Sequence, residues 1–454
     1  MNDRADVTEK QRRAQWKPRT RKPELIKVTE RIFCAADYAI SNVGFVITEN
    51  SVVVVDTTES PKVAQRVFDE FRKVCRLPVS HIIYTHFHDD HVRGASVFHE
   101  QATKIIAQRR MPAEREKLAV LLPYRTRANA LQFGARLDGE ARGVSLAYQT
   151  ARPDPSLALP GDPGGYIAPD VLFDEEYRFE QGGVAFELNH TEGETFDHLM
   201  IWLPREKALF CGDLFYSGFP MLNNPLKPDR PVLAWAQSIE RMRAFRAEYL
   251  VPSHSRPRRG AEKIHAVLDN YAQAIRHVHD ETICCINDGL SLEETRRRVT
   301  LPDALAKLPY LNEGYGKIEW AVTSVYRQNT GWLRINPQLD PADLKAAPAG
   351  VLESEIIAAC GGPPPLVSRA RRAMQAGRWQ LVLKLTGIVL AARPQNGPAR
   401  QLRIAALRAL AARARNGVER NLYAAAAAAL AQESRRAGEN GPLPASASDT
   451  TFKT

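Results

Sequence analysis

The stretch that decides the fold of this chain is Tyr84-Thr85-His86-Phe87-His88-Asp89-Asp90-His91. It follows Val79-Ser80-His81-Ile82-Ile83, an apolar run whose β-branched residues predict a buried strand. Alternate side chains share a face in an extended segment, so His86 and His88 can bind one ion. The turn that follows offers Asp90 and His91 to a second. Imidazole and carboxylate groups are ligands of zinc and similar metals, so this stretch predicts a metal site rather than a polar loop.

Length and composition indicate a soluble chain with more than one domain. At 454 residues it exceeds one usual hydrophobic core, which predicts two domains plus tails. No run of 18 apolar residues occurs, so no stable membrane insertion is expected. The six cysteines form no C-x-x-C pair, and residues 1–27 lack the apolar stretch of a secretory signal. Both features predict reduced thiols and a cytoplasmic location.

The net charge of +10 is unevenly distributed. Residues 1–27 carry +5 and residues 366–454 carry +11, which leaves −6 for residues 28–365. A nucleic-acid enzyme is expected to place its basic stripe around the catalytic cleft. Here the basic charge lies in the terminal parts, which favours solvated helix faces over nucleic-acid binding.

Alternating strands and helices predict an α/β domain over residues 26–285, after a basic N-terminal tail of residues 1–25. Val52-Val53-Val54-Val55 is typical of a strand buried on both faces. Helices are expected at 61–74, 90–98 and 231–247. Further strands are expected at 31–35, 43–48, 104–107, 184–189, 199–203, 207–211 and from Tyr249 up to His254.

Two segments depart from this alternation. Residues 109–181 have few regular periods and predict a lid-like insertion with helical pieces near 113–135. Residues 286–435 predict an all-helical second domain, followed by a tail at 436–454. Within it, Gly377-Arg378-Trp379 and Pro394 indicate one helical hairpin of tetratricopeptide type, which needs neighbours to bury its apolar face.

The second half of the metal site lies further along the chain. Gly193-Glu194-Thr195, Gly212-Asp213 and Ser253-His254 follow expected strands. Together with residues 86–91, they resemble the metallo-β-lactamase superfamily, which implies an αββα sandwich with a two-metal site along one edge. Glu194 stands where many members have histidine, as in the type III alkylsulfatases. The helical half is similar to their dimerisation domain through Pro309–Gly316 and Gly331-Trp332.

That resemblance implies a ligand set for two zinc ions, or for similar divalent transition metals. One metal takes His86, His88 and Glu194, the other takes Asp90, His91 and His254, and Asp213 bridges them. His190 or His198 could ligate in place of Glu194. Thr85 is expected to brace the loop by hydrogen bonding.

The catalytic residues expected from the resemblance are Asp90, Asp213 and Lys227. The arginine that binds sulfate in that family corresponds here to Leu226. We therefore expect the neighbouring Lys227 to take its role, with Arg230 as the alternative. The longer alkylsulfatases also carry a C-terminal lipid-carrier-like domain, which is not expected in this chain.

The expected reaction is hydrolysis of a sulfate ester of a medium-chain alcohol, a small amphiphile. Two metals about 3.5–4 Å apart lower the pKa of a bound water and polarise the ester, so no serine or cysteine nucleophile is needed. The alternatives are hydrolysis of carboxylic esters, lactones or thioesters, an iron-dependent oxidoreductase of the same superfamily, and a helical scaffold with an inactive site. Five insertion residues could line an alkyl pocket or be plain core: Leu118, Leu121, Leu122, Leu131 and Phe133.

Assembly is predicted from the helical half. Trp320, Tyr326 and Trp332 lie among apolar neighbours. Together they present more apolar surface than a single helical hairpin can bury. With the resemblance to a dimerisation domain, they predict a symmetric homodimer. The alternative is that these aromatic side chains pack on the catalytic domain of the same chain.

Overall fold

A computed structural model of the chain describes residues 22–135, 137, 164–345 and 347–440. Within the described residues the chain forms two compact units, which are described separately. The first comprises residues 22–135, 164–344 and 415–418, and the second comprises most of the helical C-terminal part. No described helix is both long and apolar enough to cross a membrane.

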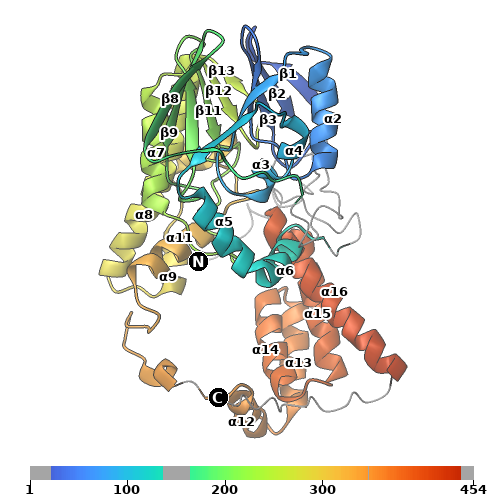
Figure 1. The fold of residues 1–454 in the computed structure, drawn as a ribbon. Helices are drawn as coiled ribbons and strands as arrows, with labels where there is room; N and C mark the ends of the chain where they lie inside the picture. Colours follow the sequence, from blue (N-terminus) through green and yellow to red (C-terminus); the bar gives the residue numbers. More distant parts are fainter. Residues whose placement is uncertain (1–21, 136, 138–163, 346, 441–454) are drawn as a thin grey trace, which may run out of the picture. The chain divides into compact units, whose positions relative to one another are not determined.

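Seven strands form the first sheet, and they follow one another in chain order (Figure 1). The strands from β1 to β4 pair antiparallel, whereas those from β4 to β7 pair parallel. Their bounds are β1 Glu24–Lys27, β2 Ile32–Ala36, β3 Val43–Ile47, β4 Val52–Val55, β5 Val79–Ile83, β6 Lys104–Gln108 and β7 Val171–Phe173.

Six strands form the second sheet, in the order β13-β12-β11-β10-β9-β8. Only the pair β11 and β12 is parallel. The bounds are β8 Glu176–Gln181, β9 Val184–His190, β10 Leu199–Leu203, β11 Ala208–Gly212, β12 Tyr249–Pro252 and β13 Arg258–Arg259.

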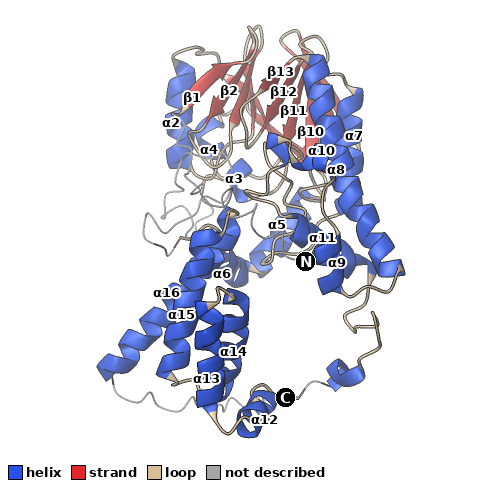
Figure 2. Ribbon diagram, turned by 180° about the vertical axis from the view of Figure 1, so that it is seen from behind, coloured by secondary structure: helices blue, strands red, loops and turns tan. Residues whose placement is uncertain are grey.

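The two sheets face each other between helical layers (Figure 2). Helices α2 (Pro61–Arg72) and α4 (Ala95–Phe98) cover the first sheet, and α7 (Val232–Ala244) and α8 (Ala261–Asn287) lie along the second. The buried strand β4 shows how the layers form. Its residues Val52 and Val54 pack under α2, while Val53 and Val55 face the second sheet. The predicted αββα sandwich is confirmed.

The predicted insertion is only partly separate from this sandwich. Its helical pieces are confirmed as α5 (Met111–Val120) and α6 (Leu122–Gln132). The prediction that it extends to residue 181 was wrong, because β7 and β8 are edge strands of the two sheets. Both are short or alternately exposed, so their sequences lack the apolar run of a central strand. Residues 138–163 lie outside the described residues.

The helix predicted over residues 90–98 is broken in two. Residues Asp89–Val92 form α3 and Ala95–Phe98 form α4, with Arg93 and Gly94 between them. A Cβ at Gly94 would lie 1.8 Å from the Thr57 carbonyl oxygen, so only glycine allows this close approach. The break keeps the turn that follows β5 packed against the end of β4.

Helices continue the first unit beyond the predicted boundary at residue 285. These are α9 (Leu292–Arg298), α10 (Asp303–Ala306), a 3₁₀ turn at Pro309–Leu311 and α11 (Ile318–Asn329). The first unit extends to Leu344. At the other end, β1 begins at Glu24 inside the predicted tail, and residues 1–21 lie outside the described residues.

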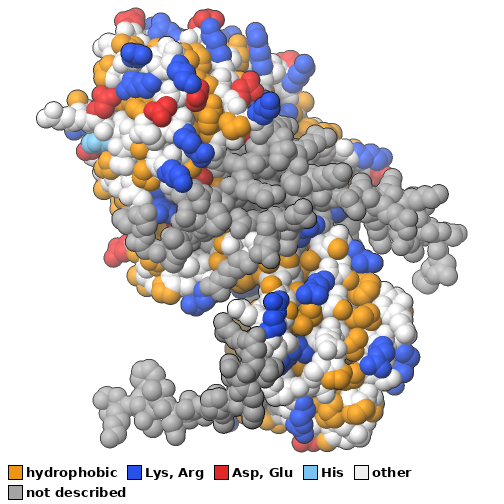
Figure 3. All heavy atoms as spheres, turned by 90° about the vertical axis from the view of Figure 1, so that its right-hand side faces the viewer, with side chains coloured by type: hydrophobic (Ala, Val, Ile, Leu, Met, Phe, Trp, Pro, Cys, Tyr) orange, Lys and Arg blue, Asp and Glu red, His pale blue; other side chains and the backbone are white. Residues whose placement is uncertain are grey.

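The second unit is helical. It contains α12 (Val351–Ala359), α13 (Pro363–Gln375), α14 (Trp379–Ala392), α15 (Gly397–Arg413) and most of α16 (Gly417–Asn440), after a 3₁₀ turn at Pro341–Lys345. Helices α14 and α15 form the predicted hairpin, and α13 and α12 pack on α14, which supplies the neighbours that the hairpin needs. On the face shown in Figure 3, this unit carries hydrophobic and basic side chains with few acidic ones.

Candidate metal centre

The candidate ligands come from the ends of strands in both sheets. His86 and His88 lie on the turn between β5 and α3 (Asp89–Val92), and Asp90 and His91 lie in α3 itself. Glu194 lies between β9 and β10, Asp213 directly follows β11, and His254 follows β12. Since β4 and β5 are parallel, as are β11 and β12, these turns meet at one edge of the sandwich. The structure brings all seven predicted ligands together there.

The first group contains His86, His88, Glu194 and Asp213, whose ligand atoms all lie within 4.8 Å of one another. His86 Nε2 lies 2.9 Å from His88 Nδ1 and 3.9 Å from Asp213 Oδ2. His88 Nδ1 lies 3.5 Å from Glu194 Oε1. A tetrahedral zinc site with bonds of about 2.0–2.1 Å places neighbouring ligand atoms about 3.3 Å apart, so this group fits one such ion.

The second group contains Asp90, His91 and His254, again within 4.8 Å. Asp90 Oδ2 lies 3.4 Å from His91 Nε2 and 3.3 Å from His254 Nε2. Asp213 reaches this group as well, because its Oδ1 lies 3.6 Å from His91 Nε2 and its Oδ2 lies 2.9 Å from His254 Nε2. Asp213 therefore stands between the two groups, in the position expected of a bridging carboxylate.

Two buried atoms indicate that this arrangement is built around cations. His91 Nε2 and Asp213 Oδ1 are buried and have no hydrogen-bond partner among the described residues. A buried polar atom without a partner is costly, and a metal ion between them removes that cost. The nitrogen and oxygen donors suit zinc and its neighbours. The residues present therefore fit divalent metal binding.

The protonation of the metal-free chain differs between the two groups. Burial holds the pKa of His86 and His88 well below the usual range, so both imidazoles are neutral and ready to ligate. Burial acts in the same direction on His254, but the Asp213 carboxylate outweighs it and raises the pKa to about 10. The pKa of His91 is likewise raised, by Asp90 and Asp213. In the metal-free chain, the protons on His91 and His254 thus supply the positive charge that a metal ion would supply between these carboxylates.

Asp56 organises the centre, and the sequence did not single it out. It directly follows the buried strand β4 and has a positive φ of 59°. Its carboxylate accepts hydrogen bonds from Thr85 N and Thr85 Oγ1, each at 2.9 Å, and lies 2.8 Å from His91 Nδ1. Ser253 Oγ, beside His254, donates to it at 2.9 Å. The expected bracing role of Thr85 is visible here. The sequence feature that could have identified Asp56 is its position directly after four consecutive valines, where a buried strand ends.

The alternative ligands His190 and His198 lie outside both groups. His198 Nε2 accepts a hydrogen bond from Asp213 N at 3.1 Å, and its Nδ1 lies 3.1 Å from Thr191 Oγ1. Gly212 makes this possible, since it has a φ of +50° and a Cβ there would lie 2.4 Å from His198 Nε2. His198 therefore positions Asp213 rather than binding a metal. His190 Nε2 lies 2.9 Å from the Phe196 carbonyl oxygen.

Basic residues border the first group. Arg230 is buried and donates hydrogen bonds to Glu194 Oε2 and to the Met221 carbonyl oxygen, so its charge is matched by Glu194. Lys227 forms no ion pair and donates no side-chain hydrogen bond within the described residues. Burial, together with Arg125 and Arg230, lowers the pKa of Lys227 to about 8. Of the two cations considered from the sequence, Lys227 is the one available to an anion.

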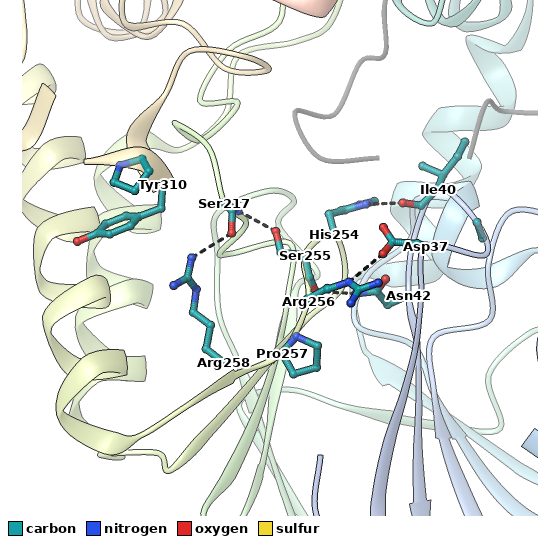
Figure 4. A pocket seen from close by; sticks show the side chains of 12 residues that line it. Asp37, Ile40, Asn42, Ser217, His254, Ser255, Arg256, Pro257, Arg258 and Tyr310 are labelled. Atoms are coloured by element: carbon teal, nitrogen blue, oxygen red, sulfur yellow. Dashed lines mark hydrogen bonds and ion pairs between the residues drawn. The ribbon is translucent and has the colours of Figure 1, made fainter. Parts of the chain in front are cut away.

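A pocket of about 470 Å³ lies on the other side of His254 (Figure 4). His254 Nδ1 lies 2.8 Å from the Ile40 carbonyl oxygen (Figure 4), which orients the ring with Nε2 near the carboxylates of Asp90 and Asp213. The polar groups around it are largely paired with each other: Arg258 donates to Ser217, Ser217 N donates to Ser255 Oγ, and Arg256 pairs with Asp37. These paired polar groups therefore form a fixed pocket lining that supports the ring of His254.

Known proteins resemble the chain in both sequence and fold. Residues 37–254 match the family model described as metallo-beta-lactamase superfamily, and residues 291–433 match the one described as alkyl sulfatase dimerisation. A linear primary-alkylsulfatase from Pseudomonas sp. is 30% identical over 372 residues, which cover 79% of this chain and 68% of that protein. An alkyl/aryl-sulfatase from Saccharomyces cerevisiae is 25% identical and is matched over 85% of this chain and 60% of its own length.

A solved structure has the same fold. It is a stereoselective inverting sec-alkylsulfatase from Pseudomonas sp., with a TM-score of 0.80 at 22% sequence identity. The match covers 90% of this chain and 65% of that one. The chain thus spans between 60% and 68% of the length of these three relatives.

Proposed function

This chain belongs to the alkylsulfatase branch of the metallo-β-lactamase superfamily, and from that premise we propose that it hydrolyses sulfate esters of medium-chain alcohols. The observation that carries the proposal is an unmatched cation beside a candidate metal centre. Lys227 is half-buried, has no ion-pair partner among the described residues, and borders the group that contains His88 and Glu194. A charge partly withdrawn from water gains from a counter-charge, and an anionic ester supplies one.

Two divalent ions of the zinc type, held by His86, His88, Glu194, Asp90, His91 and His254 with Asp213 between them, would supply an activated water near neutral pH and polarise the ester. The chain's own residues do the positioning. Asp56 and His198 hold His91 and Asp213 in place through hydrogen bonds. Arg230 neutralises part of the charge of Glu194, whose pKa burial would otherwise raise further than about 7.

Lys227 takes the place of the family's arginine as the group that faces the sulfate. Lysine binds an oxyanion as a point charge, whereas arginine binds it with a planar fork of donors. The lysine therefore allows looser geometry. We propose that the sulfate is held less rigidly here than by relatives that carry the arginine, and that turnover of alkyl sulfates is accordingly weaker.

Apolar side chains near the site support an amphiphilic substrate. Of the five leucine and phenylalanine residues considered for an alkyl pocket, Leu118 packs against the core under the first sheet. Leu121, Leu122 and Leu131 are instead exposed, at 50%, 37% and 37%. Leu122 and Leu131 lie on α6, and Leu121 directly precedes it. Tyr124 on the same helix donates to the Leu226 carbonyl oxygen beside Lys227. We propose that these three leucines contact the alkyl chain.

A matched substrate panel tests the proposal. The zinc-loaded protein is assayed with octyl and decyl sulfate, with carboxylic esters of the same alcohols and with a lactone. Turnover of the sulfates, lowered at least tenfold by Lys227→Ala, is expected. Turnover of carboxylic esters or lactones with none of any alkyl sulfate would assign the chain to that class instead. Iron analysis of the purified protein, with a test for oxidation of thiol substrates, addresses the oxidoreductase alternative.

We also propose a homodimer and a cytoplasmic location. The homodimer is supported by the match to a dimerisation family over residues 291–433 and by the exposed Trp332. The location is supported by six cysteines, none of which forms a disulfide.

A further inference from the structure

We propose that Arg125 on helix α6 is a substrate-binding residue that holds the anionic group of the ester together with Lys227, an inference that rests on the proposed function. Position 125 lies in the insertion, more than 100 residues before Lys227 in sequence. Nothing in its sequence context marks it among the many arginines of that segment. The fold brings it to the site.

Hydrogen bonds at both ends of α6 fix where Arg125 lies. Tyr124 Oη donates to the Leu226 carbonyl oxygen at 3.0 Å, which places the neighbouring Arg125 beside Lys227. At the other end, Asn224 Nδ2 donates to Gln132 Oε1 at 2.8 Å, and Gln132 Nε2 donates to Tyr315 Oη at 3.2 Å. The helix is therefore tied to the loop of residues 221–230 that also carries Arg230.

The charges agree with this placement. The positive charge of Arg125 lowers the pKa of Lys227, in keeping with the placement that the hydrogen bonds of α6 give it. Burial and the charge of Arg230 lower its own pKa, while Asp89 opposes that change. Asp89 is already engaged, because its Oδ1 lies 3.3 Å from Arg115 Nη1.

Among the described residues, Arg125 forms no ion pair. Its Nε atom is buried, and within the same residues it has no hydrogen-bond partner. Of the three cations Arg125, Lys227 and Arg230, only Arg230 has an ion-pair partner within the part of the chain that the structure describes, namely Glu194. The positive charges of Arg125 and Lys227 repel each other, and each is partly removed from water. An anion bound between them offsets both the repulsion and the loss of hydration. A tetrahedral oxyanion, as in a sulfate ester, also offers the two adjacent oxygens that a guanidinium binds.

This arrangement assigns a role in specificity to α6. The helix carries Arg125 beside Lys227 and, one turn earlier on a similar face, the partly exposed Leu122, so one element contributes both a charged contact and an apolar one. Such an element selects an amphiphile with an anionic head over a neutral ester with the same chain. The chain's anion site is then divided between the insertion and the loop that follows β11.

The test compares Arg125→Gln with Arg127→Gln, an exposed arginine two positions along the same helix. Binding of octanesulfonate, which keeps the charged head but is not a sulfate ester, is measured by calorimetry on the zinc-loaded protein. KM and kcat are measured for octyl sulfate and for a neutral octyl ester. We expect Arg125→Gln to weaken sulfonate binding and raise KM for the sulfate at least tenfold, with the neutral ester and the melting temperature unchanged. Arg125→Lys should recover part of the binding, and Arg127→Gln should behave as the unmodified protein.

The outcomes separate this inference from the proposed function. Sulfate turnover with equal sulfonate binding by Arg125→Gln and the unmodified protein would overturn the role of Arg125 and leave the function standing. If the unmodified protein binds no octanesulfonate, the role of Arg125 is also overturned, whether or not that protein hydrolyses octyl sulfate. Loss of neutral-ester turnover or of thermal stability in Arg125→Gln would assign the residue a structural role instead.

Discussion

Asp56 is the residue on which the geometry of the metal centre depends most. Removing its carboxylate leaves Thr85 N, His91 Nδ1 and Ser253 Oγ buried without an acceptor. We expect Asp56→Ala to lower the free energy of unfolding of the metal-free chain by about 3 kcal/mol, since unpaired buried groups cost about 1–3 kcal/mol each and partly relax. Metal affinity should fall about 10–100-fold, because His91 loses its orienting partner.

Urea unfolding and competition with a zinc chelator measure these two effects. Asp69→Ala, which removes an exposed carboxylate on α2, is the control and should change neither. Unaltered zinc affinity in Asp56→Ala would show that His91 keeps its orientation without this partner.

Lys227 makes substrate binding depend on pH. Its pKa is lowered from 10.5 to about 8, first by burial and then by Arg125 and Arg230. Above that pH the ammonium loses its proton, so it no longer attracts an anionic head group. KM for an alkyl sulfate should therefore rise as pH increases through about 8, and bound metals would move the rise to lower pH because they add positive charge. Steady-state kinetics between pH 6 and 10 measure this.

The variant Lys227→Arg tests the cause of that profile. Arginine stays protonated across the whole range, so the rise in KM should disappear. A neutral octyl ester serves as the control substrate, with a KM that does not follow the ionisation of residue 227. An identical alkyl-sulfate profile in both proteins would assign the titration to another group.

Strand ends and turns show how far the sequence could predict the centre. The ligands on residues 86–91 are contiguous, and contiguous residues on an extended segment can be placed from periodicity alone. Asp56 lies 29 positions before Thr85, and His198 lies 15 before Asp213. Their contacts arise only when β4 meets β5 and when β10 meets β11. The exposed edge strands β7 and β8 were missed for a related reason, since one buried face gives a weak apolar signal.

The two ligand groups should load metal differently. In the metal-free chain, His91 and His254 hold protons that a metal must displace, whereas His86 and His88 are neutral. Zinc uptake at pH 7 should therefore release protons mainly from the second group, with a smaller share from Glu194, whose pKa is raised to about 7, and the second group should empty first as pH falls. Calorimetric zinc titrations in two buffers of different ionisation enthalpy count the protons.

Single substitutions assign those protons and the second metal to particular residues. Asp90→Ala or His254→Ala should bind one zinc less than the unmodified protein, release fewer protons and lower the rate by orders of magnitude. His265→Ala, on the outer helix α8 and away from both groups, is the control. Two bound metals and full activity in both site variants would show that the ligand assignment is wrong.

At the scale of the whole molecule, the point where the sequence becomes helical is not the point where the first compact unit ends. The sequence becomes helical near residue 286, and the dimerisation family begins at residue 291. The first unit nevertheless runs to Leu344, because α11 packs on α8 and α9. Gln328 on α11 also donates to the Arg230 carbonyl oxygen at 2.7 Å. Helical content is a local property of the sequence, whereas a unit is defined by contacts that the sequence does not reveal.

The prediction of a homodimer rests on exposed apolar side chains in the segment that follows α11. Trp332, Ile335, Leu339 and Leu344 are exposed at 73%, 65%, 56% and 61%, whereas Tyr326 on α11 is half-buried and donates to the Leu290 carbonyl oxygen. A large exposed tryptophan among apolar neighbours is typical of an interface anchor. Trp332→Ser should therefore weaken dimerisation at least tenfold, which light scattering between nanomolar and micromolar concentrations would detect. Val120→Ser, at a site 76% exposed outside this segment, should leave the dimer intact. A monomer at micromolar concentration in the unmodified protein would contradict the homodimer itself.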